Sequence, residues 1–319
     1  MTFPVHPAQA SKLAQQADYL YWGLTALSAA TLLVVFAPML YFLFKYRRGK
    51  PADRTPIQLP QTAMEITWTL IPIIIFTGLF AWGANVYWTM ERAPAGAMEL
   101  NVVAKQWMWK IQHPEGNREI NELHVPLGRI VKLTLASQDV IHSFFLPEFR
   151  IKQDVVPGRY TTIWFKAERL GAFHLFCSEY CGTHHSAMIG RVVVMKPQEY
   201  EEWLARGEPG ATMAQAGAQL YRVLGCSGCH DNGAIIRAPP LQGLYGNPVP
   251  LQSGQIVTAD DAFLRDSILL PAKDIAAGYT NDMPSFQGRV SEDELAQLMA
   301  YLKNMGSQRP IQNPNPTKQ

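Results

Sequence analysis

The chain has 319 residues, of which 48% are hydrophobic and 17% charged, and its formal net charge is +2 at pH 7. A charge this close to zero indicates neither a nucleic-acid partner nor an acidic tail. The length predicts two or three domains. All four cysteines fall in two short motifs, which leaves none for a structural disulfide elsewhere in the chain.

Two long runs without charge, residues 20–44 and 66–90, occupy the N-terminal part of the chain. Each run is long enough to cross ~30 Å of hydrocarbon as a helix. Tyrosine and tryptophan residues flank both runs, as in interfacial aromatic belts. A buried core helix is the alternative for either run, but two such runs in succession favour a transmembrane hairpin. Residues 1–18 lack the features of a secretory signal and are expected to form a short polar arm.

Residues 45–54, between these runs, are basic, with five Lys or Arg residues against one acidic residue, Asp53. The positive-inside rule therefore predicts that this segment lies in the cytoplasm of a bacterial cell. Both ends of the chain, and everything after residue 91, are then expected on the periplasmic or extracellular side of the plasma membrane.

Residues 98–196 show the alternation of short strands, separated by Gly, Pro and Asn clusters, which is typical of a β-sandwich or barrel. Trp107 and Trp109 flank Met108 in this region. Packing in the core or on a half-buried sheet face is the ordinary interpretation of such a pair. An exposed aromatic residue at which an electron donor docks is the functional interpretation. The strands are predicted at Leu100-Asn-Val-Val, Ile130-Val-Lys-Leu-Thr-Leu, Thr161-Thr-Ile-Trp-Phe and Arg191-Val-Val-Val-Met.

The stretch Cys177-Ser-Glu-Tyr-Cys181-Gly-Thr-His-His185-Ser-Ala-Met188 gathers thiol, imidazole and thioether groups in one loop. These soft and borderline ligands suit copper. Two thiolates this close in sequence can bridge two metal ions. A structural zinc site or a disulfide is the alternative, but zinc sites use Cys and His rather than Met. The loop therefore favours copper-based electron transfer.

This loop resembles the copper loop of the cytochrome c oxidase subunit II family, Cys-x-Glu-x-Cys-x3-His-x2-Met. The segment Asp139-Val-Ile-His142-Ser matches the strand that supplies one more histidine in that family. The resemblance implies a cupredoxin fold that holds two copper ions, the binuclear CuA centre. Cys177 and Cys181 would bridge the coppers, and the choice of His185 over His184 rests on the family spacing. The other implied ligands are His142, His185, Met188 and the main-chain carbonyl of Glu179.

The same resemblance implies three further roles. The side chain of Glu179 would ligate a magnesium or manganese ion shared with the catalytic subunit, and carboxylate oxygen is what such hard cations prefer. Trp107, in Gln-Trp-x-Trp, would be the point where electrons enter. Glu65, in Glu65-Ile-Thr-Trp-Thr-Leu-Ile-Pro, would lie near a proton-channel entrance of the catalytic subunit, although an acid at a membrane boundary is usually just solvated.

A second module follows a Gly/Pro-rich boundary after residue 206. Cys226-Ser-Gly-Cys229-His230 is the covalent haem c attachment signature, in which both thiols bind the haem and His230 ligates its iron. A zinc or redox-active Cys-x-x-Cys is the alternative. Met283, in Met-Pro-Ser-Phe, resembles the Met-Pro-x-Phe segment of small cytochromes c and is the implied sixth iron ligand, with a core methionine as the alternative. Met/His ligation suits an electron carrier.

Two helices are expected to frame that haem, one over residues 211–224 and one after the capping box Ser291-x-x-Glu294. Their crossing at Gly217, with Tyr301 as a packing partner, matches the cytochrome c fold.

The predicted fold is a two-helix transmembrane hairpin (1–96), an all-β cupredoxin CuA domain (97–206), an all-α cytochrome c domain (207–309) and a disordered tail (310–319). The resemblance implies subunit II of a respiratory haem–copper cytochrome c oxidase. It would relay electrons from soluble cytochrome c or another donor, through haem c and CuA, to catalytic subunit I, with subunit III as a further partner. Subunit I would reduce oxygen to water with proton pumping, and this chain would have no oxygen site of its own.

Two alternatives belong to other classes. One is the small subunit of a CuA-containing nitric oxide reductase, and the other is a membrane-anchored copper carrier or assembly protein. A carrier needs no covalent haem, so the motif at Cys226, Cys229 and His230 argues against it.

Overall fold

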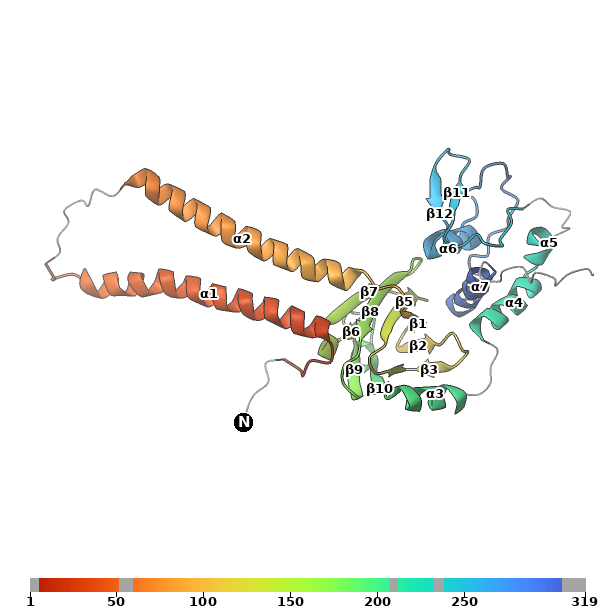
Figure 1. The fold of residues 1–319 in the computed structure, drawn as a ribbon, viewed down its shortest axis with the longest axis horizontal. Coiled ribbons are helices and arrows are strands. Elements are labelled where there is room, and N and C mark those ends of the chain that lie inside the picture. Colours follow the sequence, from red (N-terminus) through yellow and green to blue (C-terminus); the bar gives the residue numbers. More distant parts are fainter. Residues whose placement is uncertain (1–5, 52–59, 207–211, 232–237, 306–319) are drawn as a thin grey trace, which may run out of the picture. The chain divides into compact units, whose positions relative to one another are not determined.

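The computed structural model describes residues 6–51, 60–206, 212–231 and 238–305 (Figure 1). The predicted domain boundary at residue 207 and the predicted disordered tail lie outside these residues. Residue contacts divide the chain into two compact units. One contains residues 1–93 with 148–150, and the other contains residues 94–147 with 151–319.

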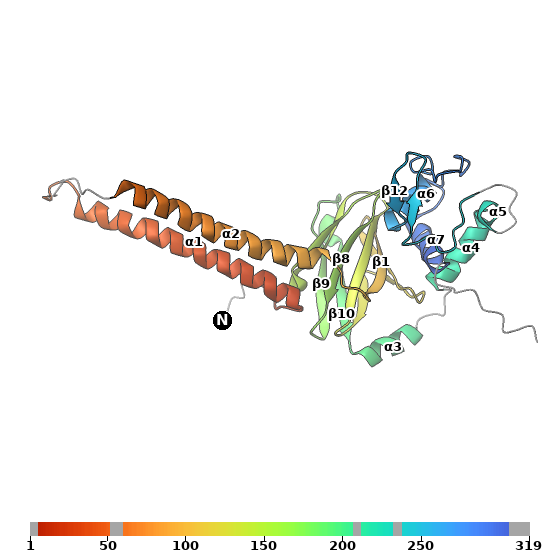
Figure 2. The same ribbon diagram turned by 45° about the horizontal axis from the view of Figure 1, so that its top comes forward.

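The first unit consists mainly of two long helices, α1 (Lys12–Lys45) and α2 (Gln61–Glu91), which lie side by side (Figures 1 and 2). They approach closely at Gly23, where an added Cβ would lie 2.9 Å from the Trp82 ring. Both helices are long and apolar enough to cross a membrane, and their apolar stretches are not buried inside the protein. A soluble core helix would bury such a stretch, so the two helices suggest a membrane anchor.

Helix α1 begins earlier than the sequence predicted. The side chain of Ser11 accepts a hydrogen bond from the amide of Ala14 and so caps the first turn. The lysine, leucine, alanine and glutamine residues that follow are good helix formers. The prediction that residues 1–18 form a polar arm was therefore wrong for residues 12–18, which are helical.

The β-domain of the second unit consists of two five-stranded sheets. The first has the order β3-β2-β1-β5-β8, and the second has the order β4-β10-β9-β6-β7. Large side chains from both sheets, such as Leu100, Trp109, Phe144 and Leu175, are fully buried and form the core. All four predicted strand segments lie in strands, which confirms the cupredoxin-like sandwich. The first sheet contains β1 (Met98–Lys105), β2 (Met108–Gln112), β3 (Arg118–Ile120), β5 (Ile130–Ser137) and β8 (Thr161–Lys166). The second contains β4 (Glu122–Pro126), β6 (His142–Leu146), β7 (Ile151–Val155), β9 (Gly171–Cys177) and β10 (Ile189–Met195).

The helical region that follows β10 contains five α-helices and a small two-stranded ribbon in its described residues. Helices α4 and α7 pack against each other at Gly217, where an added Cβ would lie 2.8 Å from the Cβ of Tyr301. Both predicted helices, the capping box at Ser291 and the crossing at Gly217 are therefore confirmed. The helices are α3 (Pro197–Arg206), α4 (Met213–Val223), α5 (Ser227–His230), α6 (Asp261–Leu269) and α7 (Glu292–Asn304), and the ribbon is β11 (Pro248–Pro250) with β12 (Ile256–Thr258). Two short 3-10 helices lie in the β-domain sequence, η1 (Pro147–Phe149) and η2 (His185–Ala187).

Candidate metal and haem sites

Strand pairing brings together the predicted copper ligands from distant parts of the sequence. Strand β6 begins at His142, and β9 ends at Cys177. The two strands are antiparallel neighbours, with Phe144 opposite Cys177. The loop after β9 then carries Cys181 and turns back through η2 to Met188, just before β10. One end of the second sheet therefore supplies every donor of the candidate site.

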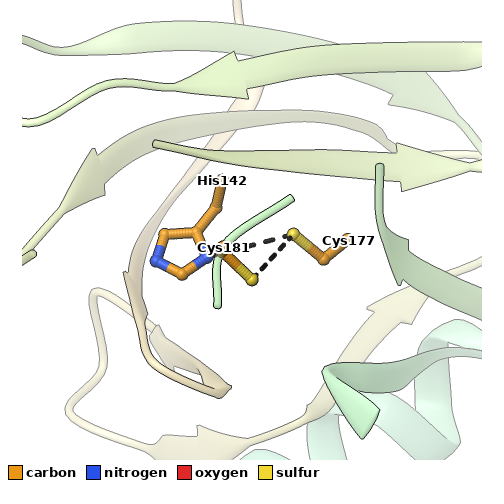
Figure 3. Close-up of side chains that lie close together, drawn as sticks. All are labelled: His142, Cys177 and Cys181. Carbon is orange, nitrogen blue, oxygen red and sulfur yellow. Dashed lines mark hydrogen bonds between the residues drawn. The ribbon is translucent and has the colours of Figure 1, made fainter. Parts of the chain in front are cut away.

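Six donor groups converge there. The two thiol sulfurs of Cys177 and Cys181 lie 3.8 Å apart, too far for a disulfide. The Nδ1 atom of His142 lies 3.9 Å from the Cys177 sulfur, and Figure 3 shows this ring and both thiols turned toward one another. On the other side of the pair, the Cys181 sulfur lies 3.5 Å from Nδ1 of His185 and 3.8 Å from the Met188 sulfur. The main-chain carbonyl oxygen of Glu179 lies 3.3 Å from the Cys177 sulfur.

The structure distinguishes the two adjacent histidines. His185 directs a ring nitrogen toward the thiol of Cys181. The ring of His184 instead packs edge-on against Trp107, with the ring centroids 4.7 Å apart. His185 is thus the member of the pair that can share a metal with the thiols, as the spacing predicted.

The two thiols differ in their electrostatics. Burial opposes the ionisation of Cys177, but hydrogen bonds from the His142 ring and from main-chain groups outweigh it and lower the pKa of this thiol to about 6. Burial and the neighbouring Cys177 charge raise the pKa of Cys181 to about 12. The two pKa shifts run in opposite directions, so Cys177 is the thiol that ionises more readily. Because a metal binds thiolates, loading of the site must release the Cys181 proton.

Two residues that the sequence did not single out hold this site in place. The Asp139 carboxylate accepts hydrogen bonds from Nε2 of His142 (2.8 Å) and from the amide of Gln106 (2.7 Å). The bond to Nε2 leaves Nδ1 of His142 free to face the thiols, which is how outer groups orient metal-binding histidines. The side-chain amide of Gln106 donates to the carbonyl of Cys181 (2.8 Å). Both residues lie in the quoted motifs, but their partners are set by tertiary structure.

The two tryptophans of this region have different environments. Trp109 is fully buried and packs edge-on against Phe144, with the ring centroids 5.1 Å apart. Trp107 lies in the turn between β1 and β2 and is partly exposed. Its indole N–H donates to the carbonyl of Cys181 at 3.1 Å. Trp109 is therefore a core residue, whereas Trp107 is partly exposed and also hydrogen-bonded to the candidate copper loop.

The predicted haem residues line one cavity in the helical region. Cys226, Cys229, His230 and Met283 all border it, and most of its remaining lining is apolar, including Leu241, Phe263 and Phe286. Nδ1 of His230 lies 3.0 Å from the carbonyl oxygen of Pro239. This contact fixes the ring and leaves Nε2 for an iron ion. Two thiols, an imidazole, a thioether and apolar walls are the groups that haem c requires, so the residues fit it.

Glu65 and the side chain of Glu179 lie outside these two clusters. Glu65 lies in the first turns of α2 with its side chain exposed. Glu179 is also exposed, so only its main chain faces the thiols. Their predicted roles in proton access and in magnesium or manganese binding depend on groups from another subunit.

A second group of ligand-type side chains lies on the β-domain, where Glu119, Glu122 and His124 have ligand atoms within 4.8 Å of one another. The ligand atoms of these residues are already engaged in hydrogen bonds and ion pairs within the protein. The Glu119 carboxylate is hydrogen-bonded to Nε2 of His113 at 2.7 Å and to Nδ1 of His124, and Glu122 pairs with Arg191. The His124 ring stacks on Trp203, so the cluster fastens α3 to the sandwich.

Glu119→Gln is expected to destabilise the β-domain by about 2–3 kcal/mol at pH 7, because the buried carboxylate holds two imidazoles. Burial opposes its ionisation, but the His113 and His124 bonds hold the pKa of Glu119 below its usual value. The stabilisation is therefore present above the ordinary glutamate pKa of 4.5 and is lost as the pH falls through the lower folded-state value. Denaturant unfolding at pH 7 and below pH ~4 tests this. Glu122→Gln is the control, since its partner Arg191 is exposed and the pair is worth below about 1 kcal/mol.

These features define a chain with two helices apolar enough to cross a membrane, a cupredoxin-type metal loop and a cytochrome-type haem cavity. Residues 78–196 match the family described as "Cytochrome C oxidase subunit II, periplasmic domain", and residues 214–306 match the family "Cytochrome c". The first family implies the CuA copper centre, and the second implies haem.

Two relatives named as this subunit agree with this assignment. A protein of Alkalihalophilus pseudofirmus named "Cytochrome c oxidase subunit 2" is 30% identical over 290 residues, which cover 86% of this chain and 82% of the relative. A protein of Thermostichus vulcanus with the same name is 29% identical over 263 residues, which cover 65% of this chain and 79% of the relative. The crystal structure of the periplasmic domain of subunit II of cytochrome oxidase (CoxB) of Bradyrhizobium japonicum has 29% identity and a TM-score of 0.35, covering 36% of this chain and 96% of that one. The chain belongs to the cytochrome c oxidase subunit II family, as the resemblance predicted.

Proposed function

We propose that this chain is the electron-accepting subunit of a respiratory haem–copper oxidase. Electrons from a soluble cytochrome c or another donor reach haem c, pass to the CuA pair, and continue to catalytic subunit I. Subunit I reduces oxygen to water with proton pumping, and subunit III completes the core of the complex. The convergence of four further donor groups on the two thiols is the observation that carries this proposal.

The copper pair would supply a one-electron carrier, and the chain's own residues determine its environment. Cys177 and Cys181 would hold the two ions between them, with His142, His185, Met188 and the Glu179 carbonyl as the remaining ligands. The side chains of His142 and Met188 are buried, so they exclude water from the site. Asp139 fixes the His142 ring, and a rigid, dry site needs little rearrangement when its charge changes.

In the haem region we assign Cys226 and Cys229 to covalent attachment, with His230 and Met283 as the axial iron ligands. Trp107 is the point where an electron reaches the copper loop, since its indole N–H contacts the carbonyl of the bridging residue Cys181. The α1–α2 hairpin crosses the bacterial plasma membrane, with the basic connection in the cytoplasm and the metal-binding domains on the periplasmic side.

Two roles at the contact with subunit I complete the proposal. The exposed Glu179 carboxylate contributes to a magnesium or manganese site, and Glu65 lies near a proton-channel entrance. Neither side chain takes part in the candidate copper site or the haem cavity, and both are exposed. They can therefore contact groups of another subunit.

The purified complex tests the proposal directly. We expect it to contain two coppers and one haem c per copy of this chain, and to consume oxygen when reduced donor is supplied. Consumption of nitric oxide instead of oxygen would establish the reductase alternative. Exchangeable copper without covalent haem would establish a copper carrier. The relatives named as cytochrome c oxidase subunits favour the first outcome.

Met188→Leu is expected to leave haem c attached while it changes the copper spectrum and slows electron transfer out of the copper pair by roughly 10–100-fold. The thioether sulfur of Met188 lies 3.8 Å from the thiol sulfur of Cys181. Leucine fills the same buried volume without a donor atom. Near-infrared absorption and flash-induced electron transfer measure the effect. A wild-type spectrum would show that Met188 does not ligate copper. Met195→Leu, in β10 outside the cluster, is the matched control.

A further inference from the structure

Within the second unit, the segment from α4 to α7 carries the predicted haem residues and is the haem-binding region. It contacts the sandwich through Tyr160. This residue stands just before β8, at the end of the Pro157-Gly158-Arg159 turn. Its ring packs against the apolar core of the helical region, the cluster of buried residues that includes Leu264 and Met299. Its hydroxyl lies 3.3 Å from the Met299 sulfur. An aromatic side chain inserted into another region's core is the usual form of an interface anchor.

Arg265 of α6 closes over this ring. Its guanidinium carbon lies 4.9 Å from the Tyr160 ring centroid, and its Nε donates to the main-chain carbonyl of Gly158 at 3.3 Å. The two terminal nitrogens of Arg265 bind both carboxylate oxygens of Glu292, at 2.6 and 2.7 Å. Arg265 is only 3% exposed, so its charge is held away from water by these partners. A desolvated guanidinium bound to both oxygens of a carboxylate is geometrically specific, because its N–H donors form a rigid planar fork.

Weaker contacts surround this anchor. Asp293, at the start of α7, accepts hydrogen bonds from Lys110 and Gln112 of β2, each at 2.9 Å. Lys303 lies 3.7 Å from the carboxylate of Glu99 in β1. These pairs are partly exposed, and such pairs contribute little energy. Tyr160 and Arg265 therefore supply most of the interaction and fix its geometry, while the polar rim adds only weak contacts.

The anchor also lies close to the copper site along the chain. The turn that carries Tyr160 follows β7, and β7 pairs with β6 so that Val155 stands opposite His142. In the same pair of strands, Asp154 accepts a hydrogen bond from Ser143 at 2.8 Å. The contact at Tyr160 therefore attaches the helical region to β6 and β7, the two paired strands that position His142.

We propose that Tyr160 and Arg265 lock the haem-binding region onto the copper-binding sandwich in one fixed orientation, and that they act as positioning residues for electron transfer between the two. The alternative is a freely moving tethered cytochrome, which would find the copper domain only through a high effective concentration. The inference rests on the proposed electron relay, because only that function requires a constant distance between haem and copper.

Tyr160→Ala in the complete, metal-loaded oxidase tests the anchor from the copper-domain side, so the sequence around the haem is unchanged. We expect the ratio of docked to undocked molecules to fall about 30-fold, the effect of losing an interface hot spot. Amide hydrogen exchange in residues 261–269 and 292–304, which face the interface, should then accelerate by up to the same factor. Flash-induced electron transfer from haem to copper should slow in proportion to the docked fraction.

Three comparisons make the result specific. Tyr160→Phe keeps the ring and should retain near-wild-type exchange and rate. Lys110→Ala removes only a rim contact and should change either quantity less than about threefold. The haem potential and the copper spectrum should stay unchanged in all variants, since Tyr160 lines neither site. A Tyr160→Ala complex with wild-type exchange and rate would overturn the anchor. A wild-type complex that lacks copper or haem would instead overturn the proposed relay itself.

Discussion

Cys181→Ser is expected to abolish the copper centre and to lower oxygen consumption by the whole complex more than ~100-fold, while haem c stays attached. Cys181 lies at the centre of the cluster, since its sulfur faces Cys177, His185 and Met188. A serine hydroxyl is a hard donor that does not form a stable bridge between two copper ions. Even the loss of a residue that hydrogen-bonds to a metal ligand typically costs 10–100-fold, so the loss of a bridging ligand must cost more.

Metal analysis, the near-infrared spectrum and oxygen uptake together measure this outcome. Ser186→Ala is the matched control, because Ser186 lies in the same loop, is exposed and has no donor in the cluster. It should keep wild-type copper content and turnover. If Cys181→Ser retained two coppers and normal turnover, Cys181 could not be a bridging ligand, and the site would have to be reassigned around Cys177.

The convergence of the candidate copper donors could be predicted largely because most of them are close in sequence. Cys177, Cys181, His185 and Met188 share one loop, so their convergence needs only a chain reversal. His142 is different, since it lies 35 residues before Cys177 and reaches it only because β6 pairs with β9. Alternation predicts that strands exist but not which strands are neighbours, so this ligand came from the family resemblance.

The supporting contacts could not be predicted in this way. Asp139 and Gln106 come from two different turns, and their hydrogen bonds exist only once both sheets are assembled. The same holds for the anchor, in which Tyr160 of one region is enclosed by Arg265 of another. The early start of α1 has a local cause, the Ser11 cap, which the search for uncharged runs did not consider.

Gly217→Ala is expected to destabilise the haem-binding region by about 3 kcal/mol, at the upper end for overpacking. An ideal Cβ at this position would lie 2.0 Å from the main-chain oxygen of Gln297 and 2.8 Å from the Cβ of Tyr301. Backbone atoms of a helix cannot rotate aside, so α4 and α7 would have to separate. That separation opens the core around Tyr221 and Leu298, both of which line the haem cavity.

The direction of the stability change in Gly217→Ala distinguishes helix propensity from close packing. In an isolated helix, glycine to alanine stabilises by roughly 1 kcal/mol, so helix propensity alone predicts a more stable protein. Close packing at the crossing predicts a less stable one, with partial loss of haem during purification. Denaturant unfolding followed by haem absorbance separates the two. Gln219→Ala, at an exposed position of the same helix, should change the free energy of unfolding by less than about 0.5 kcal/mol. Unchanged or increased stability of Gly217→Ala would show that the two helices do not cross at this residue.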